Sequence, residues 1–190
     1  MKLFLIKILI ATLIFPVLNF SQSSPKAAIL NVILKKYYKN EKPVYKNRRQ
    51  LLYFYCDKSN NNEELLEAVK KTTLPKDFIQ EIKQKLKSDI NSENWNQELN
   101  EIYTFQQTLL KQKINDCQNL ENYHSLSLKT GLNNQRLMIV SKPIFYSKQD
   151  ICLVKITFYR NIEHNNGVIL LFEKEDNIWT IKEELNAWET

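Results

Sequence analysis

The spacing of apolar residues changes at Gln135, and this change limits the folds that are open to the chain. Upstream of it, apolar residues recur every three or four positions, as in Phe78, Ile82, Leu86 and Ile90, which is typical of an amphipathic helix. Downstream, apolar and polar residues alternate, as they do in a strand with one face on a core. The pattern therefore predicts an α+β domain in which N-terminal helices pack on a C-terminal four-stranded antiparallel meander.

Helix-start and helix-end residues divide the upstream part into several helices. Ser24 can cap a helix whose first position is Pro25, where the missing N–H is not needed. Pro43 ends that run, and Pro75 starts another. Further helical patterns cover Leu65–Val69, Trp95–Leu109 and Leu120–Leu128. The stretches 48–57 and 104–114 are compatible with either helix or strand.

Four strands are expected after the change of period. They are Arg136–Tyr146, Ile151–Arg160, Val168–Glu173 and Ile178–Leu185. Pro143 indicates an edge or a bulge in the first of them, because proline cannot donate to a sheet ladder. Asn165-Asn166-Gly167 predicts a hairpin turn, since type I′ turns need positive φ. Glu175-Asp176-Asn177 is expected to join the last two strands.

The N-terminus has the layout of a secretory signal peptide. Lys2 is followed by the apolar run Leu3–Leu18 and then by the polar exit Asn19–Ser24. We expect cleavage after Ser21, which divides the chain into a signal peptide (1–21) and one α+β domain (22–190). The protein would then be exported, periplasmic or extracellular, and would touch the membrane only during export. An uncleaved anchor is the alternative, although the charge-free stretch is short for a span.

The chain has three cysteines, and export would permit a disulfide. Cys152 alternates with Val154 and Ile156 and is interpreted as a buried core thiol. If a bond forms, we therefore expect it between Cys56 and Cys117. The competing interpretation is that all three cysteines are unpaired and pack as small apolar residues, and this interpretation has the stronger general support.

The C-terminal third resembles a group of small exported proteins of unknown function from Gram-negative bacteria. The resemblance rests on the strand Ser141–Phe145, on Leu171–Lys174 and Trp179–Ile181, and on the closing Trp188. It implies export and the fold, but no activity. The Phe-x-Lys…Trp hairpin is also similar to hairpins in the cystatins and the nuclear-transport-factor family. This implies an alternative architecture in which a curved sheet wraps a helix.

Lysines, arginines and tyrosines interleave near the start of the expected mature chain. The candidate site for an anionic surface consists of Lys35, Lys36, Tyr37, Tyr38, Lys39, Lys46, Arg48 and Arg49. Such a mixture can hold anionic glycans or lipid headgroups by charge, stacking and cation–π contact. The competing interpretation is that the tyrosines pack inward while the lysines extend to water.

Catalytic and metal-binding patterns are weak. Cys117 and His124 would lie roughly 10 Å apart along one helix, too far for a nucleophile and its base. Glu98 and Glu101 are neighbours on one helix, but a solvated helix flank explains them equally well. His124 and His164 have no metal-ligand spacing. With only 2 glycines the chain offers no glycine-rich phosphate loop, and we expect no cofactor.

The sequence favours an exported, non-enzymatic protein that binds or has a structural role at the bacterial envelope. Its partner would be an anionic envelope component or a protein, and not a nucleic acid. The first alternative is an exported inhibitor or immunity-type protein that blocks a partner enzyme, and an exposed apolar edge strand would favour it. The second is a small hydrolase, which requires Glu98, Glu101 or His124 to meet in one cleft.

Overall fold

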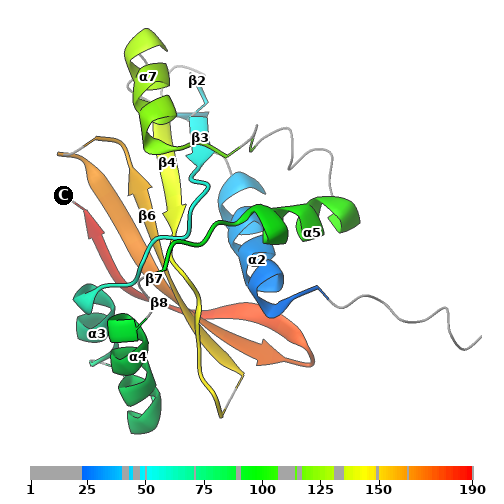
Figure 1. Cartoon of the computed structure of the whole chain (residues 1–190), viewed down its shortest axis with the longest axis vertical. Helices are drawn as coiled ribbons and strands as arrows, with labels where there is room; N and C mark the ends of the chain where they lie inside the picture. Colours follow the sequence, from blue (N-terminus) through cyan, green and yellow to red (C-terminus); the bar gives the residue numbers. More distant parts are fainter. Residues whose placement is uncertain are drawn as a thin grey trace, which may run out of the picture.

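The computed structural model describes residues 23–39, 43–44, 48–49, 51–70, 72–88, 91–106, 114, 117–130, 135–148, 150–161 and 163–189. Within these ranges the protein is α+β, with five named helices and a six-stranded mixed sheet (Figure 1). The helices are α2 (Pro25–Lys39), α3 (Glu63–Val69), α4 (Lys76–Ser88), α5 (Asn96–Gln106) and α7 (Leu120–Thr130). The strands are β1 (Pro43–Val44), β2 (Arg48–Arg49), β3 (Leu51–Phe54), β4 (Gln135–Val140), β5 (Ile144–Phe145), β6 (Ile151–Tyr159), β7 (Asn165–Glu175) and β8 (Ile178–Glu189). The expected signal peptide lies outside the described residues.

The antiparallel meander is present as part of a larger sheet. The strand order is β3-β4-β6-β7-β8, with β5 paired to β6, and the pairs from β4 to β8 are antiparallel. The prediction of a purely antiparallel four-stranded sheet is corrected by β3, which runs parallel to β4. Parallel neighbours need a long crossover, and here the chain forms α3, α4, α5 and α7 between the two strands. The stretch 48–57, whose sequence is compatible with either helix or strand, thus contains strands.

The helices cover both faces of the sheet. This arrangement differs from the alternative architecture, in which a curved sheet wraps a single helix. On one face, Val154 and Leu170 pack with apolar residues of α2 and α5. On the other, Leu153 and Ile169 pack with α3 and α4. Adjacent strand residues point to opposite faces, so the buried run Val168–Phe172 makes β7 a central strand with a core on each side.

A hairpin joins β6 and β7 as predicted, but its turn does not lie at Asn165-Asn166-Gly167. These residues already belong to β7, and the turn lies before them, where the Arg160 N–H donates to the His164 carbonyl at 3.2 Å. Gly167 is needed for a different reason. A Cβ at this position would lie 2.2 Å from a ring carbon of Trp188 and 2.6 Å from the Ile156 carbonyl oxygen. The glycine thus allows the close approach of a side chain and a backbone.

The junction between the last two strands is as expected. Asp176 and Asn177 have φ of 47° and 64°, and they separate the paired residues Glu175 and Ile178. Two successive positive φ values define the primed two-residue hairpin turn.

Pro143 lies in the interruption between β4 and β5. Val140 pairs with Ile156 and Ile144 pairs with Leu153, so one extra residue is accommodated on the side of the proline. The Ser141 hydroxyl oxygen accepts a hydrogen bond from the Lys155 N–H at 2.9 Å. A side chain therefore replaces a ladder acceptor at the bulge, as the prediction of a bulge at Pro143 requires.

We predict that Gly167→Ala lowers the free energy of unfolding by about 1–3 kcal/mol, because the methyl group overpacks the contact with Trp188. Urea unfolding measures the loss. Gly167→Ala combined with Trp188→Ala should lose less than the sum of the two single variants, since the ring clash is gone while the Ile156 carbonyl remains. A Gly167→Ala variant as stable as the wild type would contradict the packing described above.

Candidate functional site

The structure distributes the residues of the predicted anionic-surface site over different environments. Lys35 is exposed, but Lys36 forms an ion pair with Glu184. Tyr38 is buried with 1% of its surface exposed. Tyr37 packs edge-on against Phe158 at a ring-centroid distance of 4.9 Å. The side chains of Lys39, Arg48 and Arg49, and all of Lys46, lie outside the described residues.

The residues considered for catalysis or metal binding do not meet. Glu98 contacts Lys58, whereas Glu101 accepts a hydrogen bond from the Ser24 N–H at 2.9 Å. His124 lies 3.3 Å from the Tyr159 hydroxyl, and His164 contacts Asn161 in the β6–β7 turn. Within the described ranges, no group of three or more His, Cys, Asp or Glu side chains is arranged to hold a metal ion.

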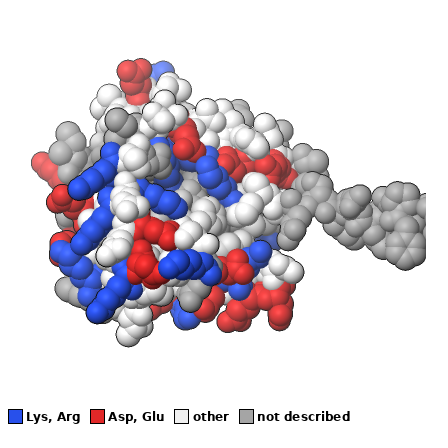
Figure 2. Space-filling model, turned by 60° about the horizontal axis from the view of Figure 1, so that its bottom comes forward, with Lys and Arg blue, Asp and Glu red and all other residues white. Residues whose placement is uncertain are grey.

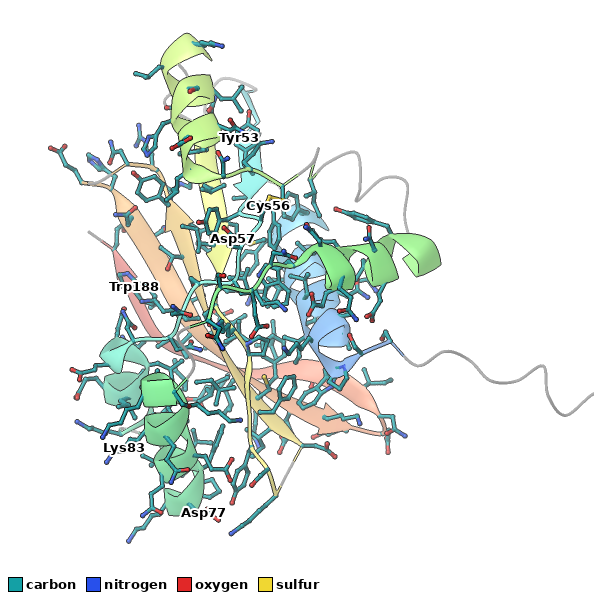
Figure 3. All side chains as sticks on the ribbon, in the orientation of Figure 1. Tyr53, Cys56, Asp57, Asp77, Lys83 and Trp188 are labelled. Carbon is teal, nitrogen blue, oxygen red and sulfur yellow. A yellow bond between two sulfur atoms is a disulfide. The ribbon has the colours of Figure 1, made fainter. Side chains whose placement is uncertain are left out.

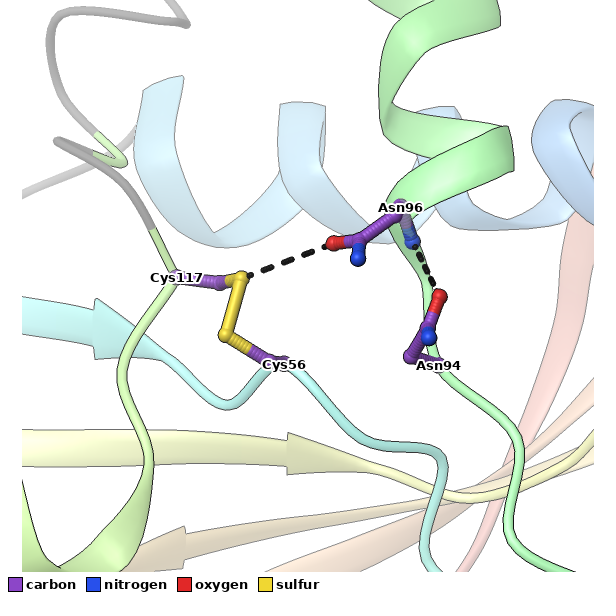
Figure 4. The surroundings of a disulfide bond; sticks show 4 residues. All are labelled: Cys56, Asn94, Asn96 and Cys117. Carbon is purple, nitrogen blue, oxygen red and sulfur yellow. Dashed lines mark hydrogen bonds between the residues drawn. A yellow bond between two sulfur atoms is a disulfide. The ribbon is translucent and has the colours of Figure 1, made fainter.

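Cys117 is bonded to Cys56, one of the three pairings that the cysteine count allows (Figure 4). The bond closes a sequence separation of 61 residues. The Cys117 sulfur lies 3.9 Å from the Asn96 side-chain oxygen, and the Asn96 N–H donates to the Asn94 side chain at 3.1 Å. The disulfide therefore lies beside the first turn of α5. Cys152 is a free and fully buried cysteine, and burial raises the pKa of its thiol.

A buried charge cluster lies close to the disulfide. The Lys58 ammonium is 2.7 Å from Glu98 Oε1 and 3.3 Å from Glu93 Oε2, and it lies 4.7 Å from the ring centroid of Trp95. The side chains of Lys58 and Glu98 are only 4% and 7% exposed. The Lys142 side chain, also 4% exposed, lies 3.9 Å from Glu93. A buried charge is stable only when it is paired, so Lys58 and Glu98 depend on each other. Glu93, whose side chain is 35% exposed, lies at the rim and contacts Lys58 and Lys142.

The cluster joins segments that the sheet and helices do not hold by themselves. Lys58 belongs to an extended segment in which Asp57 bridges to Asn94 and Ser59 bridges to Ser141. The Lys58 N–H also donates to the Glu93 carbonyl at 2.8 Å. Every member is engaged by another part of the chain, and we assign the cluster a structural role.

A groove lies beside the last turn of α2, at the edge strand β8. It has a volume of about 450 Å³. Its lining consists of Tyr37, Phe158, Asn166, Gly167, Val168, Glu184, Ala187, Trp188 and Glu189. Figure 3 labels Trp188 near the C-terminal end of β8, and Asp77 and Lys83 on α4. A volume of this size is within the range of ligand sites, and we take the groove as the candidate site.

Two features of β8 shape this groove. The register against β7 shifts between Gly167 and Ile169, and Asn186 has a φ of 42°. A bulge of this kind bends an edge strand. A second hollow of about 240 Å³ lies beside the same bulge, next to α3, with Glu67, Glu183 and Glu184 in its lining. Glu184 thus lines both hollows.

The groove is aromatic and acidic. Burial, and then the negative charge of Glu184, raise the pKa of the Tyr37 hydroxyl, so the ring carries a neutral phenol. Arg136 approaches from the side and donates to the Asn166 side-chain oxygen at 2.9 Å. Neither lysine nor arginine is among the lining residues that the structure describes. This composition differs from the basic groove that an anionic ligand would require.

Another aromatic cluster lies where α7 packs on the ends of β4 and β6, and it includes Tyr159, the residue after Phe158. Tyr123 contacts the rings of Tyr53, His124 and Tyr159 at centroid distances of 6.0, 5.9 and 5.9 Å. Its hydroxyl donates to the Gln135 carbonyl at 3.1 Å, and burial raises its pKa to about 12. These contacts fasten α7 to the ends of β4 and β6.

Charge on the end of the molecule that carries α4 is mixed. Lys76, Lys83 and Lys87 are exposed on this helix, while Asp77 pairs with Lys148 at 2.6 Å. Figure 2 shows lysines and arginines interspersed with carboxylates over this face. In the portion of the chain that is described, no helix is long and apolar enough to cross a bilayer.

Sequence analysis found Tyr37 and Lys36 but missed Phe158, Asn166, Glu184 and the role of Trp188. Phe158 continues the alternation that predicted a core strand, and no motif in the sequence distinguishes Glu184 from other exposed carboxylates. A glycine inside a strand pattern is a signal for close packing, so Gly167 indicates a close contact but not that Trp188 makes it. Comparisons with protein-family models, with curated proteins and with solved structures found no match.

We predict that acid destabilises the protein partly through Glu93. Burial alone would raise the pKa of this carboxyl, but hydrogen bonds and charges of Lys26 and Lys58 outweigh burial and lower the pKa. A carboxyl with a lowered folded-state pKa stabilises the protein above its ordinary pKa, and this contribution is lost as the pH falls. The free energy of unfolding should therefore drop between about pH 5 and about pH 3 less steeply in Glu93→Gln than in the wild type.

Chemical unfolding across this pH range measures the two slopes. Glu163→Gln, which alters an exposed carboxylate in the β6–β7 turn, serves as the matched control and should keep the wild-type slope. Equal slopes for Glu93→Gln and the wild type would refute the assigned role of Glu93.

Proposed function

We propose that this chain is an exported, non-enzymatic binding protein that holds a partner in the groove beside β8. The observation that carries the proposal is the groove itself, in which half-buried aromatic residues of α2 and β6 meet two carboxylates of β8. Aromatic surface supplies most of the contact energy in binding sites, while a few polar groups fix orientation.

Two features support export. The first 21 residues have the pattern of a signal peptide. The Cys56–Cys117 bond is the kind of cross-link that persists in oxidising compartments. Export would place the groove where it meets envelope or extracellular molecules.

The charges around the groove disfavour an anionic surface as the partner. Lys36 is paired with Glu184, and Tyr37 faces Phe158. An anionic ligand in the groove would meet Glu184 and Glu189, and like charges at a binding site are unfavourable.

An inhibitor or immunity-type protein that blocks a partner enzyme is the second candidate. It is favoured by the position of the groove on β8, which ends the strand order and has no strand partner on its outer side among the described residues. A partner protein can follow such an edge with its backbone.

We predict a position-specific cross-link between this groove and its partner. The full chain would carry a photo-reactive phenylalanine analogue in place of Ala187, which lines the groove and is exposed. The matched control places it at Gln84, which is exposed on α4. After irradiation of the producing cells, we expect a discrete adduct with the Ala187 variant only, in the fraction outside the cytoplasm. The same adducts from both positions, none from Ala187, or adducts confined to the cytosol would contradict the proposal.

A further inference from the structure

We infer that the groove beside β8 recognises a cationic side chain, arginine or lysine, presented by a protein partner. This inference rests on the proposed binding function and adds the chemical class of the ligand. It would make the predicted anionic-surface residues Lys36 and Tyr37 part of a site with the opposite charge preference.

The groove combines aromatic rings with carboxylates. Tyr37 and Phe158 present half-buried rings in edge-to-face contact, and Glu184 and Glu189 supply negative charge from the neighbouring strand. A ring face together with a carboxylate is the arrangement that attracts an ammonium or guanidinium group. Asn166 adds an amide whose oxygen already accepts from a guanidinium, that of Arg136, at 2.9 Å.

A cation of this chain already occupies the rim of the groove. The Lys36 ammonium forms an ion pair with Glu184, and it lies 5.6 Å from the centroid of the Tyr37 ring. Lys36 is therefore an internal stand-in for the ligand. Its side chain is 31% exposed and that of Glu184 is 51% exposed, so the pair is a surface pair of low strength. An incoming cation can displace it.

One carboxylate of the groove remains available. Glu189 is exposed, lines the groove, and forms no ion pair with any residue that the structure describes. It faces Asn166 across the strand pair. A cation between Glu189 and the rings would gain a charge partner without removing Lys36.

The position of the groove favours a side chain over a free small cation. Four residues of β8, the last strand in the strand order, line the groove: Glu184, Ala187, Trp188 and Glu189. An extended partner segment can run beside this strand and direct one long side chain into the groove. Arginine offers a planar fork for the carboxylates and a flat face for the rings.

Binding of N-acetyl-arginine amide to the disulfide-bonded protein tests the inference. Its neutral isostere, N-acetyl-citrulline amide, is the matched control ligand, and backbone amide NMR shifts are the readout. We expect saturable shifts at residues 166–168 and 184–189 with the arginine compound, and at least about tenfold weaker binding of the citrulline compound. Equal binding of both compounds, or no saturation with either, would overturn the inference.

Variants separate the roles of the charged groups. Glu184→Gln and Glu189→Gln should weaken arginine binding, whereas Glu175→Gln, an exposed carboxylate outside the groove lining, should leave it unchanged. Lys36→Met should strengthen arginine binding about two- to fivefold, the range expected for the loss of a competing surface ion pair. Weaker binding by Lys36→Met would show that Lys36 belongs to the ligand site and would overturn its role as a stand-in.

The experiments distinguish a failure of the proposed binding function from a failure of the proposed preference for a cation. If the Ala187 adduct forms but arginine and citrulline compounds bind alike, the protein binds a partner that does not present a cation, and only the further inference is overturned. If neither the adduct nor a saturable shift is seen, the binding function is overturned as well.

Discussion

The pairing of Lys58 with Glu98 is the interaction on which the rest of the structure depends. Both side chains are more than nine-tenths buried, and Glu98 Oε2 has no hydrogen-bond partner among the described residues. Lys58 is therefore the main compensation for a carboxylate removed from water. The pair fixes α5 on the extended segment 55–59. Glu101, one turn further along α5, accepts the Ser24 N–H and so fixes the start of α2. The far end of α2 carries Lys36 and Tyr37 to the groove, so the geometry of the site is set in this core.

The disulfide supports the same region by a different mechanism. A bond that closes a loop of 61 residues is expected to stabilise the folded state by about 4 kcal/mol, because it removes loop entropy from the unfolded chain. It holds Cys117 beside the start of α5, where the chain has few ladder hydrogen bonds. In a reducing compartment this contribution would be absent, and the charge cluster and the backbone hydrogen bonds of segment 55–59 would hold the segment.

Local sequence patterns predicted most helices and strands of this fold. Long-range contacts determined the position of one turn and the pairing of β3, which local patterns do not specify. Strands β6 and β8 follow from alternation, and the start of α2 follows from Ser24, whose hydroxyl accepts the Ala27 N–H at 3.2 Å. The Asn-Gly signal before Val168 failed because the glycine is required by Trp188, which is distant in sequence. Strand β3 could not be assigned, since its partner β4 is separated from it by four helices. The groove escaped prediction for the same reason: Tyr37, Phe158 and Glu184 come from three elements, and they meet through the register of β6, β7 and β8 and the packing of α2 on the sheet.

A double-mutant cycle on Lys58 and Glu98 tests the central claim most directly. The unfolding free energies of the wild type, Lys58→Met, Glu98→Met and the double variant would be measured under non-reducing conditions. We expect Lys58→Met to lose about 3–5 kcal/mol, because it leaves the Glu98 carboxylate buried and unpaired. Glu98→Met should lose less, because Glu93 still pairs with Lys58 at 3.3 Å. The double variant should recover most of the loss seen in Lys58→Met, since two apolar side chains replace the pair. Additive losses, or single variants as stable as the wild type, would contradict the claim that this pair organises the fold and its groove.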